Sequence, residues 1–293
     1  MKALSAGSGM SPLAGFSSPK FRLLHALRTL GLLRVADHAK FVFSQAQVRS
    51  SNRRFIKQNP RFAVPPEHLA FDALNHVDWV RYQDSGLQHA GVFARVIRAH
   101  ARQQATLAVL EWGCGPGRLI RHLPDLLPGR ALEITGADYN PESTAWCKAH
   151  LPGIHFVENA LNPPLPLAAA SFDVVYNFSV FTHLSGAVQL AWVQELKRVL
   201  KPGGLLICTT HGDNYRHLLS TVAEQRAYAA GRSIEQGRYR EGRKWFLAIH
   251  PPAYVREQLL AGWQDVAHMP TEPGDGMLQD VWMARKPGAD DTA

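Results

Sequence analysis

A glycine-rich stretch, EWGCGPGR at residues 111–118, follows a short apolar run. Its glycines stand at every second position, which indicates a loop whose backbone passes close to a ligand. A dinucleotide fold requires the spacing G-x-G-x-x-G, but Arg118 stands where the third glycine would be, and Pro116 lacks an amide donor. No Gly-Lys-Ser/Thr follows, as a P-loop would require. The stretch therefore predicts a ligand other than a pyrophosphate.

An acidic residue follows the next predicted strand. Asp138 lies 21 residues beyond Gly117, the last glycine of the loop. A carboxylate at the end of a second strand commonly accepts hydrogen bonds from both hydroxyls of a ribose, because it offers two acceptor oxygens. Together the loop and Asp138 predict a site for a nucleoside without a diphosphate, and S-adenosylmethionine fits that description.

Strand-like and helix-like segments alternate around these residues. The patterns predict strands at 107–112, 131–137, 154–158, 173–178 and 204–210, helices at 117–127, 141–150 and 186–200, and two last strands at 264–269 and 280–286. We also expect helices at 88–101 and 251–260. Strands separated by helical patterns of this length imply a parallel sheet covered on both faces.

The motifs over roughly residues 105–287 resemble the class I S-adenosylmethionine-dependent methyltransferase family. They are, in chain order, Val109–Gly117, Asp138 with Tyr139, Glu158–Ala160, Phe172–Asn177 and Leu196–Gly204. In the family the first motif borders the methionine part of the cofactor, and the acid of the second holds the ribose. The third usually reads Asp-Ala and contacts the adenine amine; here Asn159 replaces the aspartate and keeps an acceptor oxygen.

The resemblance implies a Rossmann-like, doubly wound, mostly parallel seven-stranded sheet with an antiparallel last strand. An N-terminal helical arm and an insertion after the fifth strand complete this α/β fold. The cofactor-binding residues that we carry over from the resemblance are Glu111, Trp112, Gly113, Cys114, Gly115, Gly117, Arg118, Asp138, Tyr139, Asn159, Ala160, Leu161, Asn177, Phe178, Ser179 and His183.

Two histidines follow the fourth and fifth predicted strands, at the edge where ligands of such sheets bind. His183 and His211 are our candidates for a general base, which methyl transfer requires only when the acceptor must lose a proton. Alternatively, His183 caps the following helix or bonds the backbone, and His211 orients the substrate without proton transfer. His250 is a third candidate.

Other motifs narrow the chemistry. In some quinone-biosynthetic relatives, glutamates near the histidine bind a divalent metal, but Ser179 and Thr182 stand at those places, so we expect no metal. The stretch Asn162–Leu165 is similar to the Asn-Pro-Pro-aromatic motif of enzymes that methylate nucleic acid bases. It precedes the fourth strand rather than following it, and Leu165 is not aromatic, so DNA base methylation is disfavoured.

The N-terminal part carries the basic character of the chain. Of 293 residues with a net charge of +8, residues 1–62 hold eleven Lys/Arg and one acid, Asp37. We expect helices over 19–58 whose basic face is solvated, touches an anionic membrane surface or acidic partner, or binds nucleic acid. Three scattered cysteines and no bilayer-spanning run of roughly 18 apolar residues favour the cytoplasm.

Composition and pattern divide the chain as follows. We expect residues 1–19 to be disordered, 20–103 to form a helical arm and lid, 104–287 to form the methyltransferase domain, and 288–293 to be a tail. Within the domain, 212–250 forms a substrate-side insertion. Trp79 and Tyr82 either close over the cofactor as part of the lid or pack the arm against the domain.

The segments Ser179–Leu184, Pro65-Pro66 and Gly242–Pro252 resemble a bacterial subgroup associated with glycan or small-molecule biosynthesis. We therefore expect methyl transfer to a small molecule or glycan, at oxygen, by in-line displacement in which the protein positions the reactants. Two alternatives stay open: a cofactor-binding partner subunit without turnover, and an RNA methyltransferase that uses the basic arm.

Overall fold

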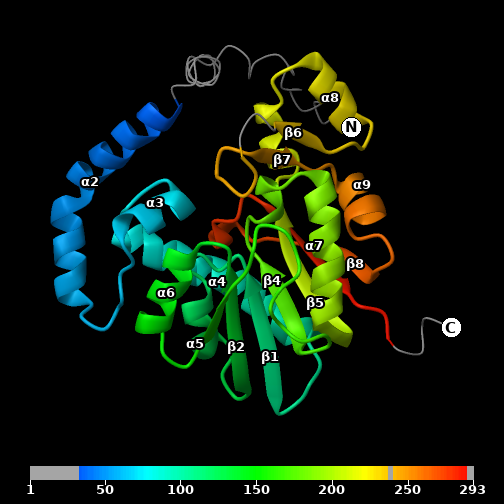
Figure 1. Cartoon of the computed structure of the whole chain (residues 1–293), viewed down its shortest axis with the longest axis horizontal. Helices are drawn as coiled ribbons and strands as arrows, with labels where there is room; N and C mark the ends of the chain where they lie inside the picture. The colour runs from blue at the N-terminus through cyan, green and yellow to red at the C-terminus, as the bar shows by residue number, and fades with distance from the viewer. Residues whose placement is uncertain (1–32, 237–239, 289–293) are drawn as a thin grey trace, which may run out of the picture.

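The computed structural model describes residues 33–236 and 240–288, so the predicted disordered segment 1–19 and residues 289–293 of the tail lie outside the described residues. A seven-stranded sheet with the order β3-β2-β1-β4-β5-β9-β8 forms the centre (Figure 1). Strand β9 pairs antiparallel with both its neighbours, and the other pairings are parallel, which confirms the predicted fold class. The strands are β1 (Thr106–Trp112), β2 (Ala131–Asp138), β3 (His155–Glu158), β4 (Phe172–Asn177), β5 (Leu200–Thr210), β8 (Gln264–Met269) and β9 (Asp280–Arg285).

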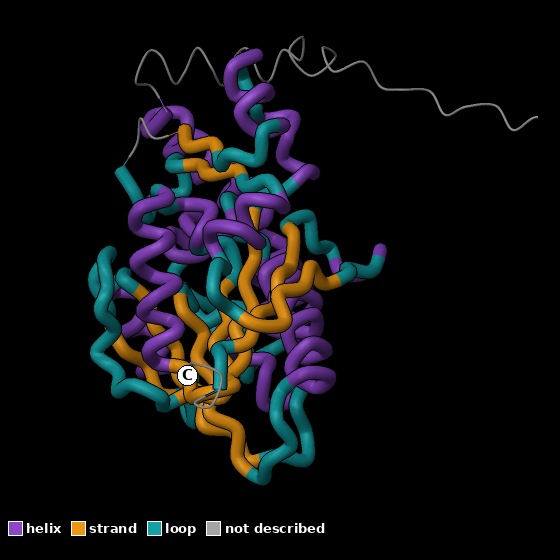
Figure 2. Tube along the Cα trace, turned by 90° about the vertical axis from the view of Figure 1, so that its right-hand side faces the viewer, coloured by secondary structure: helices purple, strands orange, loops and turns teal. Residues whose placement is uncertain are grey.

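Helices cover both faces of the sheet (Figure 2). Because successive side chains of a strand point to opposite faces, Val109 packs with α4 and its neighbour Leu110 packs with α7. Every residue of β1 after Thr106 is buried, as expected of a strand covered on both sides. One layer consists of α4 (Trp79–His100), α5 (Leu123–Leu126) and α6 (Pro141–His150), and the other of α7 (Gly186–Val199) and the π-helical turn η5 (Val255–Leu259).

The order of the strands creates a crevice at the ends of β1 and β4. From β1 the chain proceeds outward through β2 and β3, then crosses back to β4 on the other side of β1. Trp112 pairs with Ala137 of β2, whereas Glu111 pairs with Tyr176 of β4. Loops that leave the carboxyl ends of two such strands diverge, and ligands of open α/β sheets bind between them.

Two N-terminal helices, α2 (Leu33–Gln58) and α3 (Glu67–Leu74), lie along one flank of the sheet (Figure 1). The buried Asn52 side chain fastens α2, because its amide nitrogen donates to the Val77 carbonyl at 2.7 Å and its oxygen accepts from the Trp79 amide at 3.0 Å. Phe55 adds an apolar contact with the cluster formed by Trp79 and Tyr82.

The predicted helix at 117–127 is wrong. Only a 3-10 turn, η2 (Ile120–His122), and the four-residue α5 form there. Gly117 has a φ of +69°, which a right-handed helix does not allow, and the backbone therefore enters the helical region only after the loop.

Two other boundaries moved. Helix α4 begins at Trp79 rather than at Gln88, because the Asp78 carboxylate caps it by accepting from the Arg81 amide at 3.1 Å. Strand β5 begins at Leu200 rather than at 204, since Leu200 pairs with Phe172 of β4 and the Gly203 amide donates to the Lys286 carbonyl, just after β9, at 3.0 Å.

Short elements fill the region after β5, where we expect an insertion with few periodic signals. They are η4 (Asp213–Leu218), α8 (Val222–Ala229) and a separate antiparallel pair, β6 (Ile234–Gln236) with β7 (Leu247–Ile249). The predicted helix at 251–260 is divided into α9 (Pro252–Tyr254) and η5. Two further 3-10 turns are η3 (Phe181–His183), after β4, and η6 (Pro273–Asp275), before β9.

Candidate functional site

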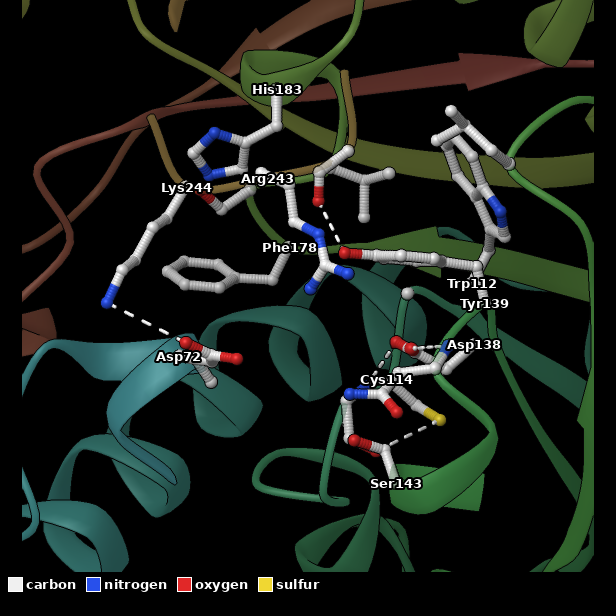
Figure 3. A pocket seen from close by; sticks show the side chains of 18 of the residues that line it. Asp72, Trp112, Cys114, Asp138, Tyr139, Ser143, Phe178, His183, Arg243 and Lys244 are labelled. Carbon is white, nitrogen blue, oxygen red and sulfur yellow. Dashed lines mark hydrogen bonds and ion pairs between the residues drawn. The ribbon is translucent and has the colours of Figure 1, made fainter. Parts of the chain in front are cut away.

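A cavity of about 670 Å³ lies at the carboxyl ends of β1, β2 and β4 (Figure 3). This volume is within the usual range for small-molecule sites. The predicted cofactor residues line it, with two exceptions: Gly117 packs below it against α6, and Asn177 is fully buried behind its wall. The crevice between β1 and β4 is therefore the place where the sequence motifs meet.

The glycine-rich loop forms one wall of the cavity. At Gly113 the φ is +78°, and an added Cβ would lie 2.3 Å from a methyl carbon of Val180, so only glycine fits. At Gly115 the φ is +50°, and a Cβ would meet no atom within 4 Å. Since Gly115 lines the cavity, that open side is room that a ligand can use.

Main-chain hydrogen bonds hold the Asp138 carboxylate beside this loop. One oxygen accepts from the Gly115 amide at 2.7 Å and the other from the Asn140 amide at 2.8 Å. Each carboxylate oxygen can accept more than one hydrogen bond, so both keep capacity for a ligand hydroxyl. Burial raises the pKa of Asp138 above its usual value.

A second buried acid, Glu111, lies near the end of β1, directly before the glycine-rich loop. The Tyr176 hydroxyl donates to its carboxylate at 2.6 Å. Burial is the largest cause of the shift that raises the pKa of Glu111 to about 8. A cationic group placed beside Glu111 would favour the ionised form of this carboxyl.

Arg118 brings a buried guanidinium to the same wall. It donates to the Ser85 hydroxyl and to Nδ1 of His89, both at 3.2 Å, and its Cζ lies 5.1 Å from the centroid of the Phe178 ring. Burial lowers its pKa to about 10, so the group stays charged at neutral pH. Within the described part of the chain, no carboxylate forms an ion pair with it.

The far end of the cavity, beyond Asp138, has a polar acceptor without a partner. The Asn159 amide nitrogen donates to the Ala160 carbonyl at 2.7 Å, whereas its buried Oδ1 accepts no hydrogen bond from any described residue. Tyr139 stands beside it, and its hydroxyl donates to the Gly242 carbonyl at 2.6 Å. The Leu161 side chain adds an apolar surface at the same end of the cavity.

Residues after β4 line the side opposite to Asp138, and they include a histidine (Figure 3). The Ser179 hydroxyl accepts from the Gln279 amide nitrogen at 2.7 Å. Nδ1 of His183 lies 2.8 Å from the main-chain oxygen of Phe246, and burial lowers the pKa of His183. His183 is therefore neutral at physiological pH, with Nδ1 protonated and Nε2 available as a base.

The other two histidines do not line the cavity. The His211 ring centroid lies 6.4 Å from that of His183, and the His211 ring stacks on Tyr215 at 3.8 Å. The fully buried His250 accepts from the Gln189 amide nitrogen at 2.9 Å. Burial lowers the pKa of His211 and of His250 to about 3, so both rings are neutral.

Comparison with known proteins agrees with this geometry. A family model described as methyltransferase domain matches residues 110–208, the part of the chain that runs from the glycine-rich loop through β5. In this part the chain is similar to class I S-adenosylmethionine-dependent methyltransferases.

The similar proteins match only part of this chain. A probable S-adenosylmethionine-dependent methyltransferase of Mycolicibacterium smegmatis is 37% identical over 123 residues, which are 42% of this chain and 44% of that protein. The malonyl-[acyl-carrier protein] O-methyltransferase of Enterobacter lignolyticus is 34% identical over 128 residues, or 44% and 47% of the two chains. The chain thus spans less than half the length of either relative. The solved citrinin polyketide synthase CMeT domain has the same fold (TM-score 0.50, 18% identity, 69% of this chain and 52% of that one).

The residues that line the cavity fit S-adenosylmethionine, the cofactor named for a similar protein. The open side of Gly115 leaves space at the loop, and the Asp138 carboxylate is fixed where a ribose needs acceptors. The unpartnered Oδ1 of Asn159 matches the need of an adenine amine for an acceptor. These three features lie along one continuous wall of the cavity.

The residues that cover the cavity lie within the expected arm and lid at 20–103 and the expected insertion at 212–250, but no motif singled them out. They come from α2 (Asp37), from α3 (Leu69, Asp72 and Ala73) and from the segment 240–245. Lys244 joins the three segments, because its ammonium lies 2.7 Å from an Asp37 carboxylate oxygen and 3.7 Å from one of Asp72. Its distance from the Phe71 ring centroid is 4.2 Å. The charged residues among those that cover the cavity fit no motif, so only the long-range contacts reveal them; they are Asp37, Asp72, Arg240, Arg243 and Lys244.

Trp79 and Tyr82 lie beneath the methyltransferase site and do not line the cavity. The buried Tyr82 hydroxyl donates to the Pro116 carbonyl at 2.9 Å and supports the glycine-rich loop from below. Trp79 packs edge-to-face against it, with ring centroids 5.9 Å apart. Of the two roles that we considered for these residues, the contacts show packing of the arm against the domain.

The described residues offer neither a metal site nor a membrane-spanning helix. Within 33–236 and 240–288, no group of three or more His, Cys, Asp or Glu side chains is arranged to hold a metal ion. None of the helices in these ranges combines the length and apolar character that crossing a bilayer requires.

Proposed function

We propose that this protein transfers the methyl group of S-adenosylmethionine to an oxygen atom of a small-molecule acceptor. The observation that carries the proposal is that Asp138 with the open side of Gly115 and His183 with its free Nε2 face one cavity from two sides. The similarity to an O-methyltransferase acting on a malonyl-carrier conjugate supports oxygen as the acceptor atom.

The proposal assigns the cofactor to the wall that the motifs form. Asp138 would accept from the ribose hydroxyls, and Asn159 with Tyr139 would hold the adenine. Glu111 would face the ammonium group, whose charge compensates the cost of ionising this buried carboxyl. Arg118 would hold the carboxylate of the methionine part, which supplies the anion that this guanidinium lacks. When bound, S-adenosylmethionine supplies an activated methyl group on a sulfonium.

His183 is our candidate for the general base. The Phe246 carbonyl can only accept, so it fixes the proton on Nδ1 and leaves Nε2 to take the proton of an acceptor hydroxyl. Such a base typically contributes roughly 10²- to 10⁴-fold to the rate. His211 lies behind the His183 ring and outside the cavity wall, so we assign it support of Tyr215 and of the loop after β5 rather than proton transfer.

Two measurements test the proposal against its rivals. Calorimetry with S-adenosylhomocysteine asks whether the site binds the cofactor's product, and absence of binding would refute it. Incubation of the protein and labelled S-adenosylmethionine with a bacterial extract then asks where the methyl group goes. We expect label in the small-molecule fraction. Binding without label in any fraction would favour a partner subunit without turnover, and label that RNase releases would favour an RNA methyltransferase.

Helix α2 has a candidate role of its own, which is contact with a membrane surface. The side chains of Val35, Val42, Phe43 and Ile56 are 47–67% exposed. At 3.6 residues per turn they share one face with the exposed Arg49, Arg53, Arg54 and Lys57, and no acid lies among them. We propose that this face rests on an anionic membrane surface. Sedimentation with vesicles containing phosphatidylserine should carry down the wild type more than a Phe43→Ser/Ile56→Ser variant, and equal recovery would refute the proposal.

A further inference from the structure

The Arg243 guanidinium points into the cavity without an acid to balance it (Figure 3). Its Cζ lies 5.8 Å from the centroid of the Tyr139 ring. No carboxylate in residues 33–236 or 240–288 forms an ion pair with Arg243, whereas its neighbour Lys244 pairs with Asp37 and Asp72. Lys244 is therefore paired within the protein, whereas Arg243 is exposed, is solvated by water in the free protein and stays available to a ligand in the cavity.

The formal charges that line the cavity balance, so the bound cofactor leaves a positive excess. The acidic residues are Asp37, Asp72, Glu111 and Asp138, and the basic residues are Arg118, Arg240, Arg243 and Lys244. With Glu111 ionised beside the ammonium group of the cofactor, the four acids offset the four bases. The ammonium and carboxylate of the cofactor cancel each other, and its sulfonium adds one positive charge. An acceptor with a negative charge would balance this excess, and a cationic acceptor would increase it.

Three guanidinium groups line the cavity, those of Arg118, Arg240 and Arg243, but the cofactor has one carboxylate. Arg118 directly follows the glycine-rich loop and lies against Phe178, at the end assigned to the methionine part. Arg243 lies instead beside Tyr139, on the segment that covers the cavity and carries Lys244. The anion that Arg243 binds must then come from another molecule.

We propose that Arg243 binds a carboxylate or phosphate group of the methyl acceptor, so that the acceptors of this site are acidic small molecules. The planar guanidinium suits both anions because it can donate two parallel hydrogen bonds to either. This inference rests on the proposed function, and the experiment below separates failure of the one from failure of the other.

The test is calorimetry on the full chain saturated with S-adenosylhomocysteine. The probes are matched pairs that differ in charge: octanoate with octanamide, benzoate with benzamide, and phenyl phosphate with phenol. We expect the anionic member of at least one pair to bind roughly tenfold or more tightly than its neutral partner. The carboxylate and phosphate pairs show which anion the site prefers. Arg243→Gln should abolish the preference, Arg243→Lys should keep part of it, and both should bind S-adenosylhomocysteine as the wild type does.

A matched control changes the net charge equally but outside the cavity. Arg226 is exposed on α8 and does not line the cavity, so Arg226→Gln should keep the preference for anions. Equal affinity for charged and neutral probes, absence of binding by every anionic probe, or a preference that survives in Arg243→Gln would each overturn the inference. Weaker binding of S-adenosylhomocysteine by Arg243→Gln would assign this residue to the cofactor instead. If the wild type does not bind S-adenosylhomocysteine, the proposed function itself fails.

Discussion

Nδ1 of His183 lies 2.8 Å from the main-chain oxygen of Phe246, so the backbone carbonyl that directly follows the covering segment 240–245 decides which nitrogen of the ring carries the proton. The carbonyl has no proton to give, and the bond therefore exists only when Nδ1 is protonated. The base of the proposed reaction is thus oriented by the residue that adjoins the segment forming the wall for the acceptor. This arrangement predicts how the site responds to pH.

The first prediction concerns the protonation of His183. Because burial lowers its pKa, the neutral ring persists below the usual value of 6.5, and activity that depends on Nε2 should stay constant through neutral pH and fall only in more acidic solution. NMR titration of the ring protons, assigned with His183→Asn, measures this pKa. A midpoint at or above 6.5 in the cofactor-loaded protein would contradict the assigned environment.

Replacing Asp138 should weaken cofactor binding. Asp138→Asn removes a charged acceptor of ribose hydroxyls, and a hydrogen bond to a charged group contributes about 1.5–3 kcal/mol, so S-adenosylhomocysteine should bind roughly 10- to 100-fold more weakly. Calorimetry provides the measurement. Asp173 is the matched control, since its carboxylate also accepts from a backbone amide, that of Ala108 at 2.9 Å, but lies outside the cavity wall. Asp173→Asn should unfold more easily without losing affinity; equal loss in both variants would refute the role of Asp138.

A methyl group on the glycine-rich loop should obstruct the cofactor. Gly115→Ala places a Cβ in open space on the cavity side, at a φ of +50°, and should reduce affinity for S-adenosylhomocysteine about tenfold or more. Gly129→Ala meets the same open space at a φ of +83° but lies outside the cavity wall. Both variants should lose about 1–2 kcal/mol of unfolding free energy from the left-handed backbone. Unchanged affinity in Gly115→Ala would show that no ligand approaches there.

Glu111 should make the free protein less stable as the pH rises. Its pKa is about 8 in the folded chain against 4.5 as the ordinary value, so its favourable contribution is complete below about pH 4.5 and is lost as the pH rises toward 8. The difference in unfolding free energy between wild type and Glu111→Gln should shift against the wild type by up to about 1.4 kcal/mol per pH unit over this range. Urea denaturation from pH 5 to 8 measures it, and a difference that does not change with pH would show that Glu111 is already ionised.

The part of the fold that the sequence predicts well is the part with strong local signals. Strand β1 is a continuous apolar run from Leu107 to Leu110. Asp138 ends a parallel strand and His183 follows another, so they had to meet at one edge of the sheet. The helix at 117–127 failed for the opposite reason: apolar residues at helical spacing outweighed the left-handed backbone that Gly117 adopts. The start of α4 was missed although Asp78, its capping residue, is a recognisable signal.

The cover of the cavity was not predictable from local pattern. Lys244 meets Asp37 and Asp72 only because α2, α3 and the segment 240–245 come together in the folded chain. Lys244 is more than a hundred positions from both acids, and nothing in the composition around it distinguishes it from a solvated surface lysine. Arg243 was missed in the same way, although it gives the clearest indication of the acceptor.

The ion pairs of Lys244 also separate two kinds of evolutionary change. The wall below the cavity is fixed by strand ends and main-chain hydrogen bonds, whereas the cover is joined through one ammonium from segments outside the parallel core. Under the proposed function, mutation of Arg243 in the cover would alter acceptor choice while Asp138 keeps its main-chain hydrogen bonds. Selection can thus exchange one half of the site as a module while the other half stays constant.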